Sequence, residues 1–413
     1  MLTFSRLLIF AIAIVPTSAY SVLTHEAIID AVWESNIRPL LLAKYPKSTP
    51  EEVLKAHAYA YGGCLGQDMG YAPFSARLWS DLTHYVRSGD LVKNMLRDAQ
   101  DIDEYAYALG ALAHYTADRT GHPTINRITA LSYPKLRAKF GDVVTYEDAP
   151  AQHLKTEFAL DVVQVARQGY APDAYHAFIG YEIAQSLMER AFHDTYGLEL
   201  KDLFLSEDLA IGTYRFSVGK LIPEMSKVAW NSKRKDIQDL SPGVVRSRYV
   251  YTLSRRQYEK EWGTKYSKPG IGARILSFTF RLIPTVGPFK ALGFKPVTAE
   301  GEKMFLASFD ATVTAYRGYL QQVRTQTLKL SDTNLDTGEL SSAGAYRLGD
   351  EAYVKLLDKL ANSKFKALTP ELQADILDHF KSAERAPAQA KDAPKLENQL
   401  AELRELKAGS VPE

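Results

Sequence analysis

Histidines and carboxylates recur at helical spacing in the middle of the chain. His114, Asp118 and His122 stand four residues apart, which places them on nearly the same face of a helix. His153 and Glu157 repeat the four-residue spacing further along. Imidazole nitrogens and carboxylate oxygens are ligands that zinc takes, and facing helices can build such sites. One such pair is usually a helix salt bridge, but the two sets together predict a metal site.

Three further candidate ligands lie upstream, at His25, Asp68 and His84. Asp68 lies in a glycine-rich segment, where a carboxylate alone would suggest a turn. His84 follows Thr83 and precedes a helical pattern. The other histidines fall outside these patterns and are predicted to be ordinary surface or core residues. They are His57, His176, His193 and His379.

Five short segments, read together, resemble the zinc-dependent phospholipase C/D family. They are Thr24-His25, Gly66–Gly70, Thr83–Tyr85, His114–Pro123 and His153–Glu157. That family includes bacterial phospholipase C and the N-terminal domain of glycosylphosphatidylinositol-specific phospholipase D, and it is related to the trinuclear zinc nucleases. The spacing of the central histidines and aspartate looks like the phospholipase D branch. The resemblance covers about residues 20 to 160 and is specific as a set, although no single motif is.

The resemblance implies three zinc ions with a defined set of ligands. The first ion would be held by Asp68, His84, His114 and Asp118, the second by His122, His153 and Glu157, and the third by Asp118, His25 and the free amino group and carbonyl of Tyr20. Tyr20 stands where the family often has tryptophan. Since the backbone is the ligand there, coordination depends on cleavage before Tyr20 rather than on its side chain.

This ligand set predicts hydrolysis of a phosphodiester. A bound zinc lowers the pKa of its water to about 7 and can clamp a phosphate, so hydroxide is available at neutral pH. Asp118 is expected to bridge two ions, and Asp68 is expected to bind zinc and to orient or deprotonate the attacking water. The predicted substrate is a phospholipid, with head-group cleavage of the phospholipase C type.

The N-terminus has the pattern of a signal peptide over residues 1–19. Arg6 precedes an apolar run over residues 7–15 that is too short to span a bilayer, and Pro16 and Ala19 fit the end and cleavage site of such a peptide. The protein is therefore expected to be secreted or periplasmic. The single cysteine, Cys64, cannot form an internal disulfide, and we expect it to be buried beside Gly62 and Gly63.

Helical periodicity dominates the sequence and predicts an all-α, multi-helix bundle. A catalytic domain is expected over 20–235, a helical C-terminal region over 236–385, and a mobile tail or lone amphipathic helix over 386–413. Helices are expected over 24–36, 101–121, 150–169, 175–196, 349–361 and 369–383, with a loop over 62–73. Pro123 predicts the end of the second of these near Gly121. The apolar segment 271–294 is either a membrane contact or a core helix.

Composition limits the alternatives to this interpretation. The chain has 413 residues, 46% hydrophobic and 24% charged, with a formal net charge of +1, so it is globular and offers no electrostatic case for a nucleic-acid partner. A nuclease with the same metal cluster remains an alternative, with Tyr61, Tyr71 and Tyr85 available to stack on bases. A non-catalytic, zinc-stabilised envelope or membrane-binding protein is the third hypothesis. The filled ligand positions weigh against it.

Overall fold

The protein is built from helices throughout the residues that the structure describes. This computed structural model describes residues 21–72, 74–167, 182–216, 295, 297–381 and 393–406, with scattered residues between 218 and 246. Tyr20, His176, the predicted signal peptide and the apolar segment 271–294 lie outside the described residues. The helices are α2 (Val22–Val32), α3 (Arg38–Lys44), α4 (Pro50–Gly66), α5 (Arg77–Tyr85), α6 (Ser88–Asp98), α7 (Ile102–Ser132), α8 (Pro134–Phe140), α9 (Pro150–Arg167), α11 (Gln185–Tyr196), α12 (Glu207–Phe216), α17 (Ala299–Arg324), α18 (Arg347–Asn362), α19 (Pro370–Lys381) and α20 (Ala393–Glu405). Short turns of π-helix (Trp33–Ile37) and 3₁₀-helix (η2, Gln67–Tyr71; η3, Leu200–Asp202) join some of them. The all-α prediction is confirmed, since the described ranges contain only one isolated β-bridge.

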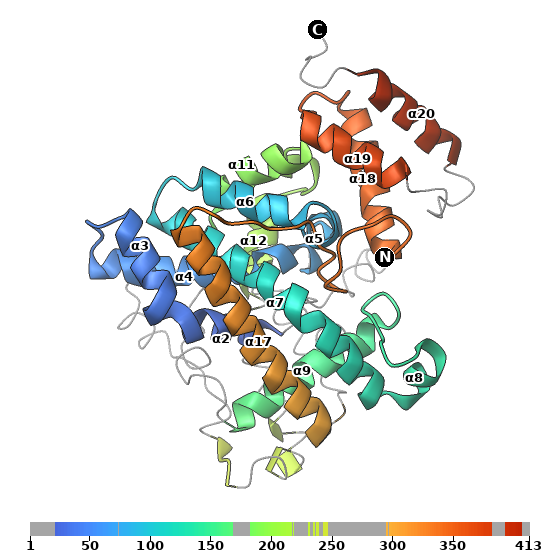
Figure 1. Cartoon of the computed structure of the whole chain (residues 1–413). Helices are drawn as coiled ribbons and strands as arrows, with labels where there is room; N and C mark the ends of the chain where they lie inside the picture. Colours follow the sequence, from blue (N-terminus) through green and yellow to red (C-terminus); the bar gives the residue numbers. More distant parts are fainter. Residues whose placement is uncertain are drawn as a thin grey trace, which may run out of the picture.

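Helix α7 is the central element of the fold, and α4, α17, α6, α9 and α2 pack around it (Figure 1). Its N-terminus is capped by Asp101, whose carboxylate accepts a hydrogen bond from the backbone N–H of Glu104 at 2.8 Å. A helix enclosed on several sides by others has little solvent-facing surface. It can therefore carry polar ligands into the interior, where water does not compete for them.

Glycines allow α4 and α7 to approach closely. A Cβ atom on Gly63 would lie 1.9 Å from the backbone oxygen of Tyr107, and one on Gly110 would lie 2.0 Å from that of Ala60. The prediction of a loop over 62–73 is wrong for this reason. The glycines there continue α4 and the short helix η2, because the packing against α7 offsets their weak intrinsic helix propensity.

The prediction that the central helix ends near Gly121 is also wrong. Helix α7 continues through Pro123 to Ser132. Proline removes one backbone hydrogen bond and costs about 3 kcal/mol in an isolated helix, but buried residues beyond it, including Ile125 and Ile128, hold the last turns in the core.

The C-terminal part ends in three packed helices. Helices α18 and α19 lie close to their predicted positions. Residues 393–405 of the predicted tail form α20, which docks on both of them. The Gln373 side chain donates to the backbone oxygen of Leu403 at 2.6 Å, and Leu403 is buried. Among the described residues no helix has the length and apolar character needed to cross a membrane.

Candidate metal centre

The structure brings eight of the nine predicted ligands into the interior of the bundle. They come from five elements, with His25 on α2, Asp68 on η2, His84 on α5, the central three residues on α7, and His153 and Glu157 on α9. All eight side chains are buried. Three sets of them have ligand atoms within 4.8 Å of one another. Asp68, His84 and His114 form one, His25, His114 and Asp118 the second, and His122, His153 and Glu157 the third.

The first two sets share His114 and form one cluster around Asp118, here called the Asp118 cluster (His25, Asp68, His84, His114 and Asp118). The Asp118 carboxylate lies 3.3 Å from Nε2 of His25, 3.4 Å from Nε2 of His84 and 3.2 Å from Nε2 of His114. Nε2 of His84 also lies 3.3 Å from the Asp68 carboxylate. Asp118 therefore lies at the centre of the cluster, beside three of its histidines.

The third set lies one helical turn further along α7 and is here called the Glu157 cluster (His122, His153 and Glu157). Nε2 of His153 lies 2.8 Å from the Glu157 carboxylate. The ring centroids of His122 and His153 are 5.3 Å apart. Two histidines and one carboxylate are three zinc ligands, and a fourth position is left for another group.

Backbone carbonyl groups fix the orientation of three of these imidazole rings. Nδ1 of His84 lies 2.8 Å from the backbone oxygen of Ser80, and Nδ1 of His114 lies 2.9 Å from that of Cys64. Nδ1 of His122 lies 2.5 Å from the backbone oxygen of Leu335.

Because a carbonyl oxygen can only accept, each of these Nδ1 atoms carries the hydrogen and donates it. In the neutral ring Nε2 is then a bare lone pair, which is the tautomer that a metal-binding histidine uses.

Burial and the carboxylates act in opposite directions on the histidines of the Asp118 cluster. Burial alone would lower the pKa of His84, but the Asp118 and Asp68 carboxylates outweigh it and raise that pKa well above its ordinary value. The pKa of His114 is raised in the same way, mainly by Asp118. Burial would raise the pKa of Asp118, but the charges of His114 and His122 outweigh it and lower that pKa well below its ordinary value. The cluster is thus an anionic centre that attracts positive charge.

In the Glu157 cluster, burial affects the pKa values more than the neighbouring charges do. It lowers the pKa of His122 to about 3 and that of His153 to about 4. Burial, helped by the negative charge of Asp68, raises the pKa of Glu157 well above its ordinary value. All three groups therefore tend toward their neutral forms in the absence of a cation.

The donor atoms of both clusters fit a bound cation. Both carboxylate oxygens of Asp68 and of Asp118 are buried, and the nearest polar groups are the Nε2 atoms of His25, His84 and His114. Nε2 of His84 and Nε2 of His114 face each other at 3.2 Å, and when both rings are neutral, in the tautomer set by their carbonyl partners, both of these atoms carry lone pairs. Buried acceptors without donors are costly, and a shared divalent cation would satisfy them.

Two residues that support the centre were missed by sequence reasoning. The Asp161 carboxylate accepts hydrogen bonds from the backbone N–H of Leu23 and the hydroxyl of Thr24, at 3.3 and 2.7 Å, and so fixes the start of α2 beside His25. Asp161 continues the spacing of His153 and Glu157, so the four-residue period could have revealed it. The other, Asp336, lies 3.4 Å from Nδ1 of His122 and carries no comparable signal.

The remaining polar and aromatic candidates have other partners. Tyr61 donates to Asp30, and Tyr85 donates to Asp336 at 2.9 Å. Tyr71 is buried, with its ring centroid 6.1 Å from that of His84. None of the three offers an exposed face for stacking on a base. The described histidines predicted to be non-ligands, His57, His193 and His379, belong to none of the three sets.

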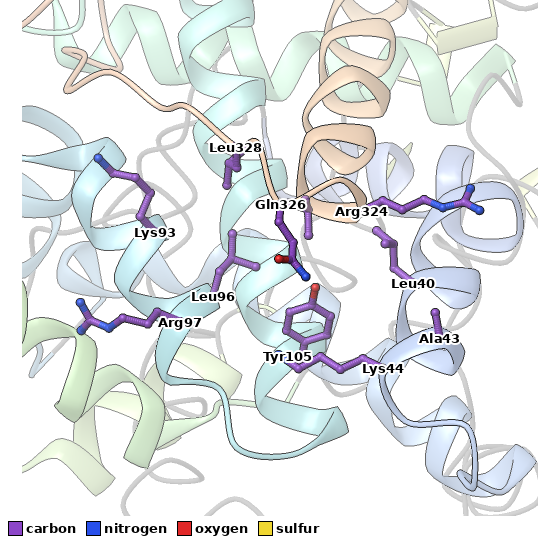
Figure 2. A pocket seen from close by; sticks show the side chains of 11 residues that line it. Leu40, Ala43, Lys44, Lys93, Leu96, Arg97, Tyr105, Arg324, Gln326 and Leu328 are labelled. Carbon is purple, nitrogen blue, oxygen red and sulfur yellow. The ribbon is translucent and has the colours of Figure 1, made fainter.

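A surface pocket of about 600 Å³ lies apart from the metal ligands. Its lining residues are Leu40, Ala43, Lys44, Lys93, Leu96, Arg97, Tyr105, Val323, Arg324, Gln326 and Leu328. Figure 2 shows Tyr105 and Gln326 pointing into the pocket, whereas Lys93, Arg97 and Arg324 extend toward its sides. Lys93 and Arg97 already form ion pairs with carboxylates. The basic groups therefore do not converge on one point, and no predicted metal ligand lines this pocket.

Comparison with known proteins agrees with the metal centre. No curated protein and no solved structure matches the chain. Residues 24–205 match the family model described as zinc dependent phospholipase C. This span contains all eight buried candidate ligands and ends before α17 and the C-terminal helices. The part of the chain that carries both clusters therefore matches the zinc-dependent phospholipase C family.

Proposed function

We propose that the protein is a zinc-dependent phosphodiester hydrolase that cleaves the head group of a phospholipid at the phospholipase C position. The observation that carries this proposal is the convergence of buried acceptors in the Asp118 cluster. Nε2 of His84, Nε2 of His114 and the Asp118 carboxylate lie within 3.2 to 3.4 Å of one another. A shared cation would satisfy these acceptors, and the family match makes zinc the metal to expect.

The two catalytic carboxylates have distinct roles in this proposal. Asp118 contacts histidines of both sets in its cluster, so it would bridge two ions and hold them at a fixed separation. Asp68 lies on a short 3₁₀-helix at the edge of the same cluster. Its carboxylate lies 3.3 Å from Nε2 of His84, so the two groups could bind the same zinc ion, and Asp68 could orient the attacking water.

Zinc, when bound, supplies a water of lowered pKa and neutralises charge on the phosphoryl oxygens. The protein's own groups prepare the site for this chemistry. The outward hydrogen bonds of His84, His114 and His122 keep the ring orientations fixed. The three ligands of the Glu157 cluster leave room for a substrate oxygen.

The third ion would complete its ligands at the mature N-terminus. His25 and Asp118 supply two ligands, and we propose that the free amine and carbonyl of Tyr20 supply the others after removal of residues 1–19. This assignment requires export, so the protein would act outside the cytoplasm. Contact of the apolar segment 271–294 with the lipid surface belongs to the same proposal.

The first test is zinc content of the exported, processed protein, with turnover measured in parallel on a phosphocholine phospholipid and on single-stranded DNA. About three zinc ions per chain and release of phosphocholine are expected. Release of free choline would instead indicate cleavage at the phospholipase D position. Turnover of DNA alone would favour the nuclease.

Other outcomes would contradict the proposal more deeply. About two ions per chain would mean that the site at Tyr20 does not form. Zinc without turnover of any phosphodiester would favour a zinc-stabilised binding protein. No zinc after purification without chelators would reject the metal centre.

A further inference from the structure

The connection between α17 and α18 crosses the metal centre from outside the family match. Its central part, residues 331–341, is here called the strap. The strap is a small hairpin closed by a backbone hydrogen bond from Asn334 to the oxygen of Glu339 at 2.8 Å, and by the bridge between Thr333 and Leu340. In Figure 1 the connection runs from the end of α17 past α6 and α5 toward α18.

One end of the strap is anchored to the start of α6. The Ser88 hydroxyl donates to the backbone oxygen of Thr333 at 2.6 Å and accepts from its N–H at 3.0 Å. The Asp332 carboxylate accepts from the backbone N–H groups of Gly89 and Asp90, both at 3.0 Å. These bonds hold the strap on the helical bundle independently of the metal ligands.

Leu335, in the middle of the strap, links the two metal clusters through its backbone. Its N–H donates to the backbone oxygen of His84 at 3.0 Å. Its own backbone oxygen accepts from Nδ1 of His122 at 2.5 Å. One residue therefore contacts a ligand of the Asp118 cluster on one side and a ligand of the Glu157 cluster on the other.

The buried carboxylate of Asp336 lies beside the ring of His122. One of its oxygens lies 3.4 Å from Nδ1 of His122. The other accepts hydrogen bonds from the hydroxyls of Tyr85 and Tyr346, at 2.9 and 2.5 Å. Asn126, one turn after His122 on α7, donates to the backbone oxygen of Asp336 at 2.8 Å. The carboxylate is thus held by tyrosines of α5 and of the segment just after the strap, and the backbone of Asp336 is held by α7.

We propose that the strap is part of the metal centre, and that Asp336 is a positioning residue which holds His122 in the orientation that directs Nε2 toward the metal of the Glu157 cluster. This inference rests on the proposed zinc site. It adds to that site a segment that the family match does not cover. Asp336 faces Nδ1, the ring nitrogen that already donates to the backbone oxygen of Leu335, so its role is to orient and polarise the imidazole rather than to bind the ion.

The charge balance supports the same role. A zinc ion held by His122, His153 and Glu157 would keep one positive charge. The hydroxyls of Tyr85 and Tyr346 stabilise the charged form of the Asp336 carboxylate, which would supply the compensating negative charge beside Nδ1 of His122.

The test compares the full-length protein with Asp336→Asn and with the matched control Asp375→Asn. Asp375 also accepts a hydrogen bond from a tyrosine hydroxyl, that of Tyr353 at 3.1 Å, but it lies on α19, outside the strap. Zinc release to a chromophoric chelator would be followed over time for each protein. Loss of such an outer partner weakens metal binding by about 10- to 100-fold, so one ion should leave that much more readily from Asp336→Asn while the other ions and the control behave as in the wild type.

A second measurement separates positioning from mere structural support. The melting temperature would be taken with and without zinc. If Asp336 had only a structural role, its loss would lower the melting temperature equally with and without zinc. If it positions His122, its loss should mainly reduce the rise in melting temperature that zinc causes. Asp336→Ala would be the second variant, with a larger reduction expected.

The ion affected by Asp336→Asn should be the one that is missing from Glu157→Gln. Release kinetics of Asp336→Asn that match the wild type, in a wild type that holds zinc, would overturn the inference and leave the proposed function standing. A wild type that holds no zinc would overturn both.

Discussion

The two clusters of the metal centre lie one helical turn apart on α7 but are built on different electrostatic principles. In the Asp118 cluster, carboxylates raise the pKa of His84 and His114. In the Glu157 cluster, burial lowers the pKa of His122 and His153 to about 3 and about 4. The first cluster attracts positive charge in any form, proton or metal. The second is a dry site of neutral imidazoles that depends on an outer carboxylate from the strap. Neighbouring groups of ligands on one helix can thus be suited to a cation by opposite means.

The largest effect is expected from Asp118→Asn, because Asp118 contacts three histidines of its cluster. Removing its charge should release the ions that it bridges and reduce hydrolysis by at least about 1000-fold, on the scale of ~4 kcal/mol of lost transition-state stabilisation. Zinc content and kcat/KM would be measured together. The Glu157 cluster should keep its ion.

Asp30→Asn is the matched control for this variant. Asp30 is another inward-facing carboxylate beside a histidine and a tyrosine, but it belongs to none of the metal sets. Its zinc content and turnover should stay near those of the wild type. If Asp118→Asn retained three ions, the bridging role would be rejected.

A smaller effect is expected from Glu157→Gln, which removes the only carboxylate of its cluster. The protein should lose one ion and keep those of the Asp118 cluster, with hydrolysis reduced by about 100-fold, or ~3 kcal/mol. The control is Glu147→Gln, whose carboxylate accepts from the backbone N–H of Leu348 and contacts no ligand. Loss of all zinc from Glu157→Gln would show that the two clusters are not separable.

The helical class and the order of the ligands could be predicted because both depend on local spacing. Four-residue periods place His114, Asp118 and His122 on one face whatever the helix packs against. The continuation of α7 through Pro123 and of α4 through its glycines could not be predicted, since in both cases tertiary packing outweighs the intrinsic preference of the residue.

The residues that support the ligands, Asp336 and Asp161, were not predicted for a different reason. Asp336 is far from every ligand in sequence and lies in a turn-rich segment, where aspartate is common. Only the fold shows that it reaches His122. Asp161 could have been predicted from its spacing, but its use in fixing α2 depends on how α2 and α9 meet.

The two clusters should also differ in how steeply zinc binding depends on pH. In the zinc-free protein the raised pKa values of His84 and His114 keep them protonated at pH values where a free histidine is neutral. Zinc must displace these protons, so its affinity falls as the pH drops through the neutral range, by up to about tenfold per pH unit for each proton. His122 and His153 are neutral above about pH 5, and only Glu157, with its raised pKa, has a proton to lose.

The measurement is zinc retained after dialysis at pH values from 8 to 5, for the wild type and for Glu157→Gln. The wild type should lose the ions of the Asp118 cluster first and over a narrow pH range. Glu157→Gln should show only that steep loss. A shallow loss in both proteins would contradict the electrostatic difference between the clusters.

The smallest effect is expected from Gly338→Ala, which perturbs the Glu157 cluster only through the strap. Gly338 has a φ of +75°, and a Cβ atom there would lie 2.6 Å from the backbone oxygen of Arg119 and 2.9 Å from Pro123. The substitution should move the turn of the strap away from α7. We expect a loss of roughly 1 to 3 kcal/mol in the free energy of unfolding.

Zinc release from the Glu157 cluster of Gly338→Ala should be faster by less than about tenfold, below the effect of losing the Asp336 carboxylate itself. Urea unfolding and chelator kinetics would measure the two effects. Gly318→Ala is the control, since Gly318 lies inside α17 and a Cβ atom there meets nothing within 4 Å. Alanine there should stabilise the helix by about 0.5 to 1 kcal/mol and leave zinc release unchanged. If Gly338→Ala also left both measurements unchanged, the strap would not be held against α7, and the Glu157 cluster would have to keep its ion without support from outside residues 24–205.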